Sequence, residues 1–264
     1  MKGSKMRKCL NFCLVLGLLF SWSLAAIAAK SIEEQAPGLK MAQQATADKQ
    51  HWITADHAKH EILQQTFTSG PEVTKACLSC HSEAAKQFHK TIHWTWLDPN
   101  VAPEERVGKA GLSINNFCIA MPGSYPRCTS CHAGYGWKDT SFDFSDQTKV
   151  DCLVCHEQTG TYKKFPAGAG NPAPKTMVFK GNQKTYHPPE WNKVAQSVGR
   201  PTRKNCGTCH FFGGGGDGVK HGDLDSSLMK PNKELDVHMG MDGKNFDCVR
   251  CHSTDLHQIA GRTY

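Results

Sequence analysis

The hydrophobic positions of this chain form one long run near its start and are scattered afterwards. Residues 9–29 are almost entirely apolar, follow four basic residues, and end in Ala26-Ile27-Ala28. A basic start, an apolar stretch and a small-x-small end are typical of a signal peptide. The sequence therefore predicts a signal peptide over 1–28 and a mature periplasmic domain over 29–264. The alternative is an uncleaved segment that anchors the chain in a membrane.

Beyond residue 30, helical and strand periods persist only over short stretches. The pattern predicts helices over about residues 54–66, 76–94 and 190–198, and little sheet. The chain contains 24 glycines and 13 prolines, which favours loops between these helices. No second run of 18 apolar residues follows the first, so we expect the mature chain to be soluble.

Cysteine and histidine change this picture more than charge does. The formal net charge of +7 falls to +3 without residues 1–28, and no dense basic tract remains. Nucleic acid is therefore not an expected partner. Ten of the 13 cysteines fall into five Cys-x-x-Cys-His motifs, numbered 1 to 5 in chain order: Cys77/Cys80/His81, Cys128/Cys131/His132, Cys152/Cys155/His156, Cys206/Cys209/His210 and Cys248/Cys251/His252.

This motif has the spacing at which c-type haem is attached covalently. Its cysteines bind the porphyrin, and its histidine binds the iron from the same side. Zinc knuckles and redox dithiols also use Cys-x-x-Cys, but neither needs a histidine after the second cysteine. We therefore expect five covalent haem c groups. The predicted fold class is a multihaem cytochrome, mostly α with extensive loops, little sheet and a haem-packed core.

Nine histidines lie outside the motifs and decide what binds the other side of each iron. Two side-chain ligands are typical of electron transfer, whereas an open or weakly held position admits a substrate. Those close to a motif in polar or mixed stretches are the expected second ligands: His57, His93, His221, His238 and His257. His89 shares the predicted helix face of His93, so either could bind iron. His51 and His60 are expected at the surface.

Other features lie near the motifs. Motifs 2 and 3 are 24 residues apart, counted from Cys128 to Cys152, so we expect their haems to be neighbours. Cys118, the one cysteine after residue 28 outside the motifs, is either a buried inert thiol or a thiol that meets a sulfur substrate beside haem. Glycines 213–216 allow the backbone to pass closely over a haem. Nearby carboxylates offer oxygen ligands for calcium, without a regular loop spacing: Asp217, Asp223 and Asp225.

Seven stretches carry a resemblance to a known family: residues 70–81, 91–96, 115–118, 150–156, 160–164, 199–203 and 257–262. Together they resemble the octahaem tetrathionate reductase family of multihaem cytochromes. The resemblance implies that motif 2 carries the catalytic haem, with lysine in place of histidine at the distal position. Lys163 or Lys164 is the expected lysine, and Lys138 is the alternative. A lysine must lose its proton to bind iron, which suits a desolvated site.

The resemblance further implies a periplasmic reductase of tetrathionate, or of nitrite and hydroxylamine, with Lys163, Lys164 and Cys118 lining the site. Its expected partners are an electron-donor cytochrome or a quinol-oxidising membrane protein, and a small inorganic sulfur or nitrogen oxyanion as substrate. The alternative function is an electron carrier in which every iron has two histidine ligands. The family has eight haems, whereas this chain ends 12 residues after His252. We therefore expect an incomplete family domain.

Overall fold

The structure is a computed structural model that describes residues 55–111, 122–211, 216–219 and 222–259. All of these residues belong to one compact unit, Asp48–Tyr264. The predicted signal peptide, His51, Cys118 and His221 lie outside the described residues. Within those residues, no helix combines the length and the apolar character needed to cross a membrane.

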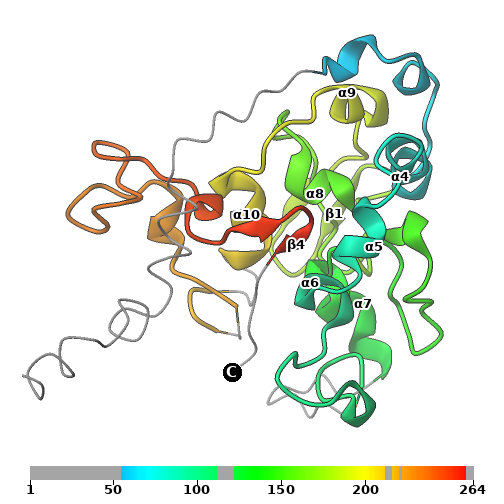
Figure 1. Ribbon diagram of the computed structural model, residues 1–264, viewed down its shortest axis with the longest axis horizontal. Helices are drawn as coiled ribbons and strands as arrows, with labels where there is room; N and C mark the ends of the chain where they lie inside the picture. Colours follow the sequence, from blue (N-terminus) through cyan, green and yellow to red (C-terminus); the bar gives the residue numbers. More distant parts are fainter. Residues whose placement is uncertain (1–54, 112–121, 212–215, 220–221, 260–264) are drawn as a thin grey trace, which may run out of the picture. The chain divides into compact units, whose positions relative to one another are not determined.

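Short helices joined by loops form most of the regular structure (Figure 1). The α-helices are α4 (Gly70–Leu78), α5 (Ala84–Phe88), α6 (Ile92–Thr95), α7 (Tyr125–Cys128), α8 (Cys152–His156), α9 (Trp191–Gln196) and α10 (Arg203–His210). The 3-10 helices are η1 (His57–Lys59), η2 (Glu61–Leu63), η3 (Pro103–Glu105), η4 (Pro122–Ser124), η5 (Thr129–Cys131), η6 (Gln147–Lys149), η7 (Ser226–Met229) and η8 (Cys248–Arg250).

The sheet content is small, as the sequence predicts. Strand β1 (Met177–Phe179) pairs antiparallel with β2 (Lys184–Tyr186), and β3 (Thr254–Asp255) pairs antiparallel with β4 (Gln258–Ile259). In the first hairpin Val178 lies opposite Thr185. The expected fold class, mostly α with extensive loops and little sheet, is confirmed.

The predicted helices differ in how well they match. Helix α9 confirms the prediction over 190–198, whereas 54–66 contains only the single turns η1 and η2. The stretch 76–94 is divided among α4, α5 and α6. The first break falls within motif 1, where the N–H groups of Cys80 and His81 both donate to the carbonyl of Cys77, at 3.1 and 2.9 Å.

Side-chain caps set where two of the motif helices begin. Asp151 precedes the first cysteine of motif 3, and its carboxylate accepts a hydrogen bond from the N–H of Val154 at 3.0 Å. Helix α10, which carries motif 4, begins with a capping box between Thr202 and Asn205. Such caps satisfy backbone donors that a helix start leaves unpaired. Each therefore fixes the motif cysteines in relation to the preceding loop.

The side-chain core is small and lies beneath motifs 1 and 3. Val73 of α4, Leu153 of α8 and Val194 of α9 are fully buried in one cluster. Figure 1 shows α8 between α4 and α10, in agreement with the packing of α8 on α10. The half-buried Cys77 and Cys155 pack at the margin of the cluster. Covalently attached haems would therefore extend this core.

Candidate redox centres

Three motif histidines face a second histidine from a distant part of the chain. The pairs and their ring-centre distances are His57 and His81 at 6.3 Å, His156 and His257 at 6.2 Å, and His93 and His210 at 6.1 Å. Two imidazoles bound at about 2 Å to opposite sides of one metal have ring centres about 6 Å apart. Motifs 1, 3 and 4 thus fit haem iron held between two histidines.

The relative tilt of the rings differs among these pairs. The ring planes meet at 17° for His57 and His81, at 60° for the motif 3 pair, and at 80° for His93 and His210. Axial ligands tune the electronic structure of haem iron. The nearly parallel pair at motif 1 and the nearly perpendicular pair at motif 4 should therefore be distinguishable by spectroscopy.

Hydrogen bonds orient three of these rings through Nδ1. Distances are 2.9 Å from His156 Nδ1 to the carbonyl of Gly199, and 2.6 Å from His210 Nδ1 to that of Gly222. His257 Nδ1 lies 3.2 Å from Oε1 of Gln87. A proton on Nδ1 leaves the lone pair on Nε2, which is the arrangement that metal-binding histidines need.

The predicted second ligands have different positions in the structure. His57 and His257 face motif histidines, and His93 faces motif 4 although motif 1 precedes it in sequence. The ring of His238 instead stacks on Phe246 at 6.2 Å. The alternative ligand, His89, stacks on Trp94 at 4.3 Å and buries Nε2 without a hydrogen-bond partner. His60 is exposed, as expected.

Motif 2 has a different environment. The ring of His132 is completely buried, and Trp94, Trp96, Trp137 and Phe142 surround it with centroid distances from 4.9 to 5.7 Å. Burial lowers its pKa to about 3, so the imidazole is neutral near pH 7. Within the described part of the chain, no histidine ring faces it as in motifs 1, 3 and 4.

The nitrogens of His132 are also arranged differently. Nε2 lies 2.8 Å from the carbonyl oxygen of Trp94, and the buried Nδ1 has no hydrogen-bond partner. The carbonyl can only accept, so Nε2 carries the proton in this arrangement. Iron binding by Nε2 requires this hydrogen bond to break. The packing leaves no space at Gly134, where an added Cβ would lie 2.8 Å from both His132 Cε1 and Trp94 Cζ3.

A buried polar network joins motif 2 to motif 3. The Asp151 carboxylate accepts hydrogen bonds from the hydroxyls of Tyr135 and Tyr162 at 2.7 and 2.8 Å. Lys164 Nζ lies 3.1 Å from the same carboxylate, and both side chains are almost completely buried. Burial and the Asp151 charge raise the pKa of both tyrosines, which remain protonated donors. Every polar group in this network therefore has a partner.

The three candidate lysine ligands for motif 2 differ in burial. Lys164 is buried and donates a hydrogen bond to the backbone carbonyl of His132, whereas Lys163 and Lys138 are exposed. The structure therefore brings only Lys164 of these three into the interior beside motif 2. The Asp151 ion pair holds it there as an ammonium group.

Cysteines from different motifs touch one another. Side-chain hydrogen-bond contacts join motif 1 to motif 3, motif 2 to motif 4 and motif 4 to motif 5: Cys77 with Cys152, Cys131 with Cys209, and Cys206 with Cys248. The backbone also brings motifs 2 and 3 together, because the N–H of Asp151 donates to the carbonyl of Ala133 at 3.0 Å. These contacts therefore connect all five attachment sites. The motifs follow one another in the order 1, 3, 2, 4 and 5, which differs from their order along the chain.

Motif 5 lies nearer the surface than motif 2. The side chains of Cys251 and His252 are exposed, whereas Cys248 is half-buried against Cys206. The physical reason is that the single turn η8 and the short β3–β4 hairpin after it contribute no residue to the buried clusters of the described chain. Cys251 therefore has a surface position.

The backbone of motif 5 nevertheless has the turn seen in motif 1. The N–H groups of Cys251 and His252 both return to the carbonyl of Cys248, at 3.2 and 2.9 Å. In motif 1 the second cysteine, Cys80, is also exposed. Exposure of the second cysteine is thus compatible with the motif geometry, and haem attachment through Cys251 stays a prediction.

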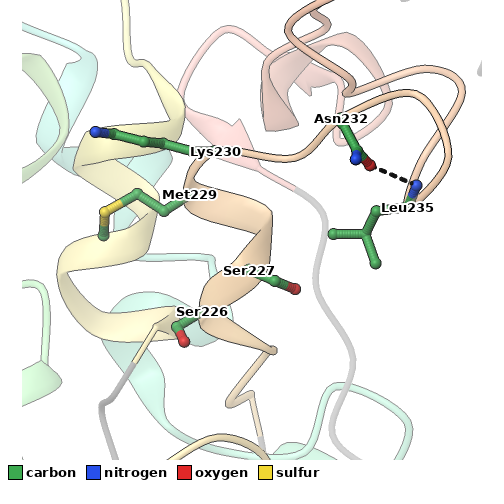
Figure 2. Close-up of a pocket in the computed structure, with 6 residues that line it drawn as sticks. All are labelled: Ser226, Ser227, Met229, Lys230, Asn232 and Leu235. Carbon is green, nitrogen blue, oxygen red and sulfur yellow. Dashed lines mark hydrogen bonds between the residues drawn. The ribbon is translucent and has the colours of Figure 1, made fainter.

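In the segment after motif 4, Asp217 and Asp225 form hydrogen bonds within the protein. Asp217 accepts hydrogen bonds from the N–H and hydroxyl of Ser226 at 3.0 and 2.9 Å, and Asp225 caps η7. Across the described ranges, no group of three or more possible ligand side chains gathers around a metal position. The nearby open hollow in Figure 2 contains no cysteine, histidine or carboxylate: Ser226, Ser227, Met229, Lys230, Asn232 and Leu235 line it.

Parts of this chain are similar to known proteins. Residues 76–157 match the family model of cytochrome c554 and c-prime. The crystal structure of octaheme cytochrome c from Shewanella oneidensis is similar, with 50% identity and a TM-score of 0.64 over 79% of this chain. These similarities support a multihaem c-type cytochrome that takes part in electron transfer.

The similarity has clear limits in length. The chain spans 43% of the length of the Shewanella oneidensis octaheme protein. An uncharacterised protein of Archaeoglobus fulgidus is 23% identical in an alignment 254 residues long. The alignment covers 81% of this chain and 83% of that protein. Covalent haem c is therefore supported, while the haem count and each iron ligand remain predictions.

No local sequence pattern indicates the aromatic residues that surround motif 2. Trp94 and Trp137, together with Phe142 and Phe144, enclose His132. In the buried network beside motif 2, Asp151 alone has a local sequence feature, because a carboxylate directly before a helix is typical of an N-cap. The aromatic residues come from stretches up to 50 residues apart, so no local pattern joins them.

Proposed function

We propose that this chain carries electrons to a reducing site at motif 2, which acts on tetrathionate or on nitrite and hydroxylamine. The observation behind this is the contrast among the motifs. At motifs 1, 3 and 4 two histidines face each other, whereas the buried ring of His132 packs among aromatic side chains. A centre without a histidine pair is suited to binding a substrate.

Each part of the chain has a role in this proposal. The motif cysteines hold the porphyrins, and the pairs with His57, His93 and His257 complete the centres that pass electrons. When bound, haem supplies electrons and an iron centre that can accept a sulfur or nitrogen atom. Reductive cleavage of the S–S bond in tetrathionate consumes an electron pair and releases thiosulfate.

Lys163 or Lys164 supplies the displaceable ligand in this proposal, and Cys118 lines the site. For Lys164 the structure offers a proton acceptor, because Asp151 Oδ2 lies 3.1 Å from its Nζ. A proton that passes from Lys164 to Asp151 leaves the neutral amine that metal binding requires. Lys163 is exposed and would have to fold inward.

The proposed setting is periplasmic, after export by the segment 1–28. Electrons come from a donor cytochrome or a quinol-oxidising membrane protein. The similarity to an octaheme cytochrome c over part of its length supports a multihaem electron route of this kind.

The second candidate function is an electron carrier with no substrate site. Three pairs of facing histidines favour it, because centres of this type exchange electrons without binding substrate. It requires a second histidine at motifs 2 and 5 as well.

The deciding experiment uses the purified holoprotein with its attached haems counted by intact mass. We expect a ferric centre without two histidine ligands in its EPR spectrum, and reduction of tetrathionate, nitrite or hydroxylamine by the reduced protein. Lys163→Ala is a clean variant because the side chain is exposed, and Lys233→Ala, at an exposed lysine that is not a candidate ligand, is its matched control. Five centres with paired histidines and no turnover would show that the chain is a carrier.

The Lys164 variant needs a stability measurement beside the spectrum. Removing this amine leaves Asp151 buried without its cation, which costs about 3–5 kcal/mol in comparable sites. Lys164→Ala combined with Asp151→Asn removes both charges. If Lys164 binds iron, both variants change the motif 2 spectrum. An unchanged spectrum in the folded double variant excludes Lys164 as the ligand.

A further inference from the structure

The segment from residue 158 to 189 has an unbalanced charge. It contains five lysines and neither aspartate nor glutamate. Lys164 is neutralised by Asp151. The other four are exposed and form no ion pair in the described ranges: Lys163, Lys175, Lys180 and Lys184.

Some lysines elsewhere on the surface are paired with carboxylates. Four of them pair with an acid three residues earlier in the chain: Lys59 with Asp56, Lys86 with Glu83, Lys149 with Asp146 and Lys193 with Glu190. A paired charge contributes little to the field at a distance, whereas unneutralised charges of one sign add together. The segment 158–189 is therefore a local source of positive potential.

The β1–β2 hairpin gives three of these lysines a defined backbone. At its turn, the side chain of Asn182 accepts from the N–H of Lys184 at 3.0 Å and donates to the hydroxyl of Tyr186 at 3.0 Å. At its open end, Thr176 and His187 are 3.1 Å apart through Oγ1 and Nδ1. These bonds fix where the lysine side chains leave the backbone.

The same hairpin packs against motif 2. Phe179 and Tyr186 lie edge-on to Phe165, with ring centres 5.6 and 5.5 Å away. The guanidinium of Arg127, the residue before Cys128, lies 5.9 Å from the centre of the Phe179 ring. Arg127 also donates to the carbonyl of Pro166 at 3.3 Å. The cationic hairpin is thus held directly beside the haem-attachment residues of motif 2.

We propose that Lys163 and the hairpin lysines 175, 180 and 184 form an anion-collecting surface that steers small inorganic oxyanions to motif 2. This inference rests on the proposed function, since it assigns the approach of the substrate to that site. Fields of clustered charge raise association rates by about 10-fold or more at low salt. They act over about 10 Å at 0.1 M salt, so the lysines need no contact with the bound substrate.

The first test compares two triple variants with equal loss of charge. Lys175→Gln/Lys180→Gln/Lys184→Gln removes the hairpin lysines. Lys230→Gln/Lys233→Gln/Lys244→Gln removes exposed lysines from a stretch that also holds three acids: Glu234, Asp236 and Asp242. We expect kcat/KM for tetrathionate and nitrite to fall about 10-fold at low salt only in the hairpin variant. The difference should disappear in about 1 M salt, and the rate with neutral hydroxylamine should not change.

The second test does not depend on turnover. Stopped-flow absorbance records haem reduction by anionic dithionite and by cationic hexaammineruthenium(II). The hairpin variant should react more slowly with dithionite at low salt and no more slowly with the ruthenium complex, while the control variant behaves as the native protein does. If no substrate is turned over but this difference is present, the proposed function fails and the anion-collecting surface stands.

Other outcomes overturn the inference. Equal salt dependence of the dithionite rate in both variants shows that the hairpin lysines do not guide anions. If the hairpin variant loses only its reaction with an acidic redox protein, such as a plant-type ferredoxin used as the probe, the hairpin is a protein-docking surface instead. Thermal unfolding of both holoprotein variants checks that the exposed substitutions leave the fold intact.

Discussion

Motifs 2 and 3 lie side by side and share one buried network, yet their histidines have opposite environments. The half-buried ring of His156 is oriented by the Gly199 carbonyl and faces His257 at 6.2 Å. The ring of His132 is completely buried, and its Nε2 is 2.8 Å from the Trp94 carbonyl. The same short motif therefore specifies haem attachment but leaves the ligand geometry to its surroundings.

The physical difference lies in what packs around each ring. Around His156, a backbone acceptor sets the tautomer that leaves Nε2 for a metal. Around His132, aromatic side chains surround the ring, Nδ1 has no hydrogen-bond partner, and burial lowers the pKa to about 3. The proposed function assigns electron transfer and substrate chemistry to neighbouring motifs that share one sequence pattern.

The largest expected effect comes from breaking the network that the two regions share. Asp151→Ala removes the acceptor of both tyrosine hydroxyls and leaves Lys164 buried without a counter-charge. Loss of one partner of a buried ion pair costs about 3–5 kcal/mol. Chemical denaturation of the holoprotein should show a decrease of this size in the free energy of unfolding.

Asp146→Ala provides the matched control for that variant. Asp146 also caps a helix, by accepting from the N–H of Thr148 at 3.0 Å, and it pairs with Lys149. Both partners are about a third exposed, so the loss should be about 1 kcal/mol. Equal destabilisation by the two variants would contradict a special role for the buried network.

A smaller effect is expected when the facing histidine of motif 3 is removed. His257→Ala should convert one low-spin centre into one with an open position and move its reduction potential by on the order of 100 mV, because axial ligands set the potential. Spectroelectrochemistry with EPR measures both changes. His60→Ala is the control, since its side chain is exposed and is not an expected ligand. A shift in the control and none in His257→Ala would reverse the ligand assignment.

The smallest effect concerns the side chain that orients His257. Gln87 Oε1 lies 3.2 Å from His257 Nδ1. Gln87→Leu removes one hydrogen bond of about 1 kcal/mol, which corresponds to on the order of 50 mV for a one-electron couple. Gln87→Glu should shift the same potential in the opposite direction, because a carboxylate makes the imidazole a stronger ligand. A potential that is unaffected by both substitutions would rule out this orienting role.

The sequence predicts the haem chemistry far better than the arrangement of the haems. The motif spacing is local chemistry, and the scarcity of sheet follows from the glycine, proline and short periodic stretches. The partner of His210 is not local, because His93 lies more than a hundred residues earlier and closer to motif 1. Nearness in sequence to motif 1 therefore did not indicate that His93 faces the histidine of motif 4.

Local sequence patterns also could not predict the helix lengths or the surroundings of each motif, for another reason. The predicted helix over 76–94 is interrupted where the motif turn returns His81 N–H to the Cys77 carbonyl. Lys164 has no sequence feature that separates it from Lys163, and only burial against Asp151 distinguishes them. These differences depend on packing between distant segments.

EPR of the oxidised holoprotein, with haems counted by intact mass, tests the central claim most directly. We expect low-spin signals from a nearly parallel pair at motif 1 and a nearly perpendicular pair at motif 4, which have ring angles of 17° and 80°. We also expect a ferric signal from motif 2 without paired histidines, which Lys163→Ala or Lys164→Ala alters. A spectrum in which every haem, including that of motif 2, has two histidine ligands would contradict this assignment.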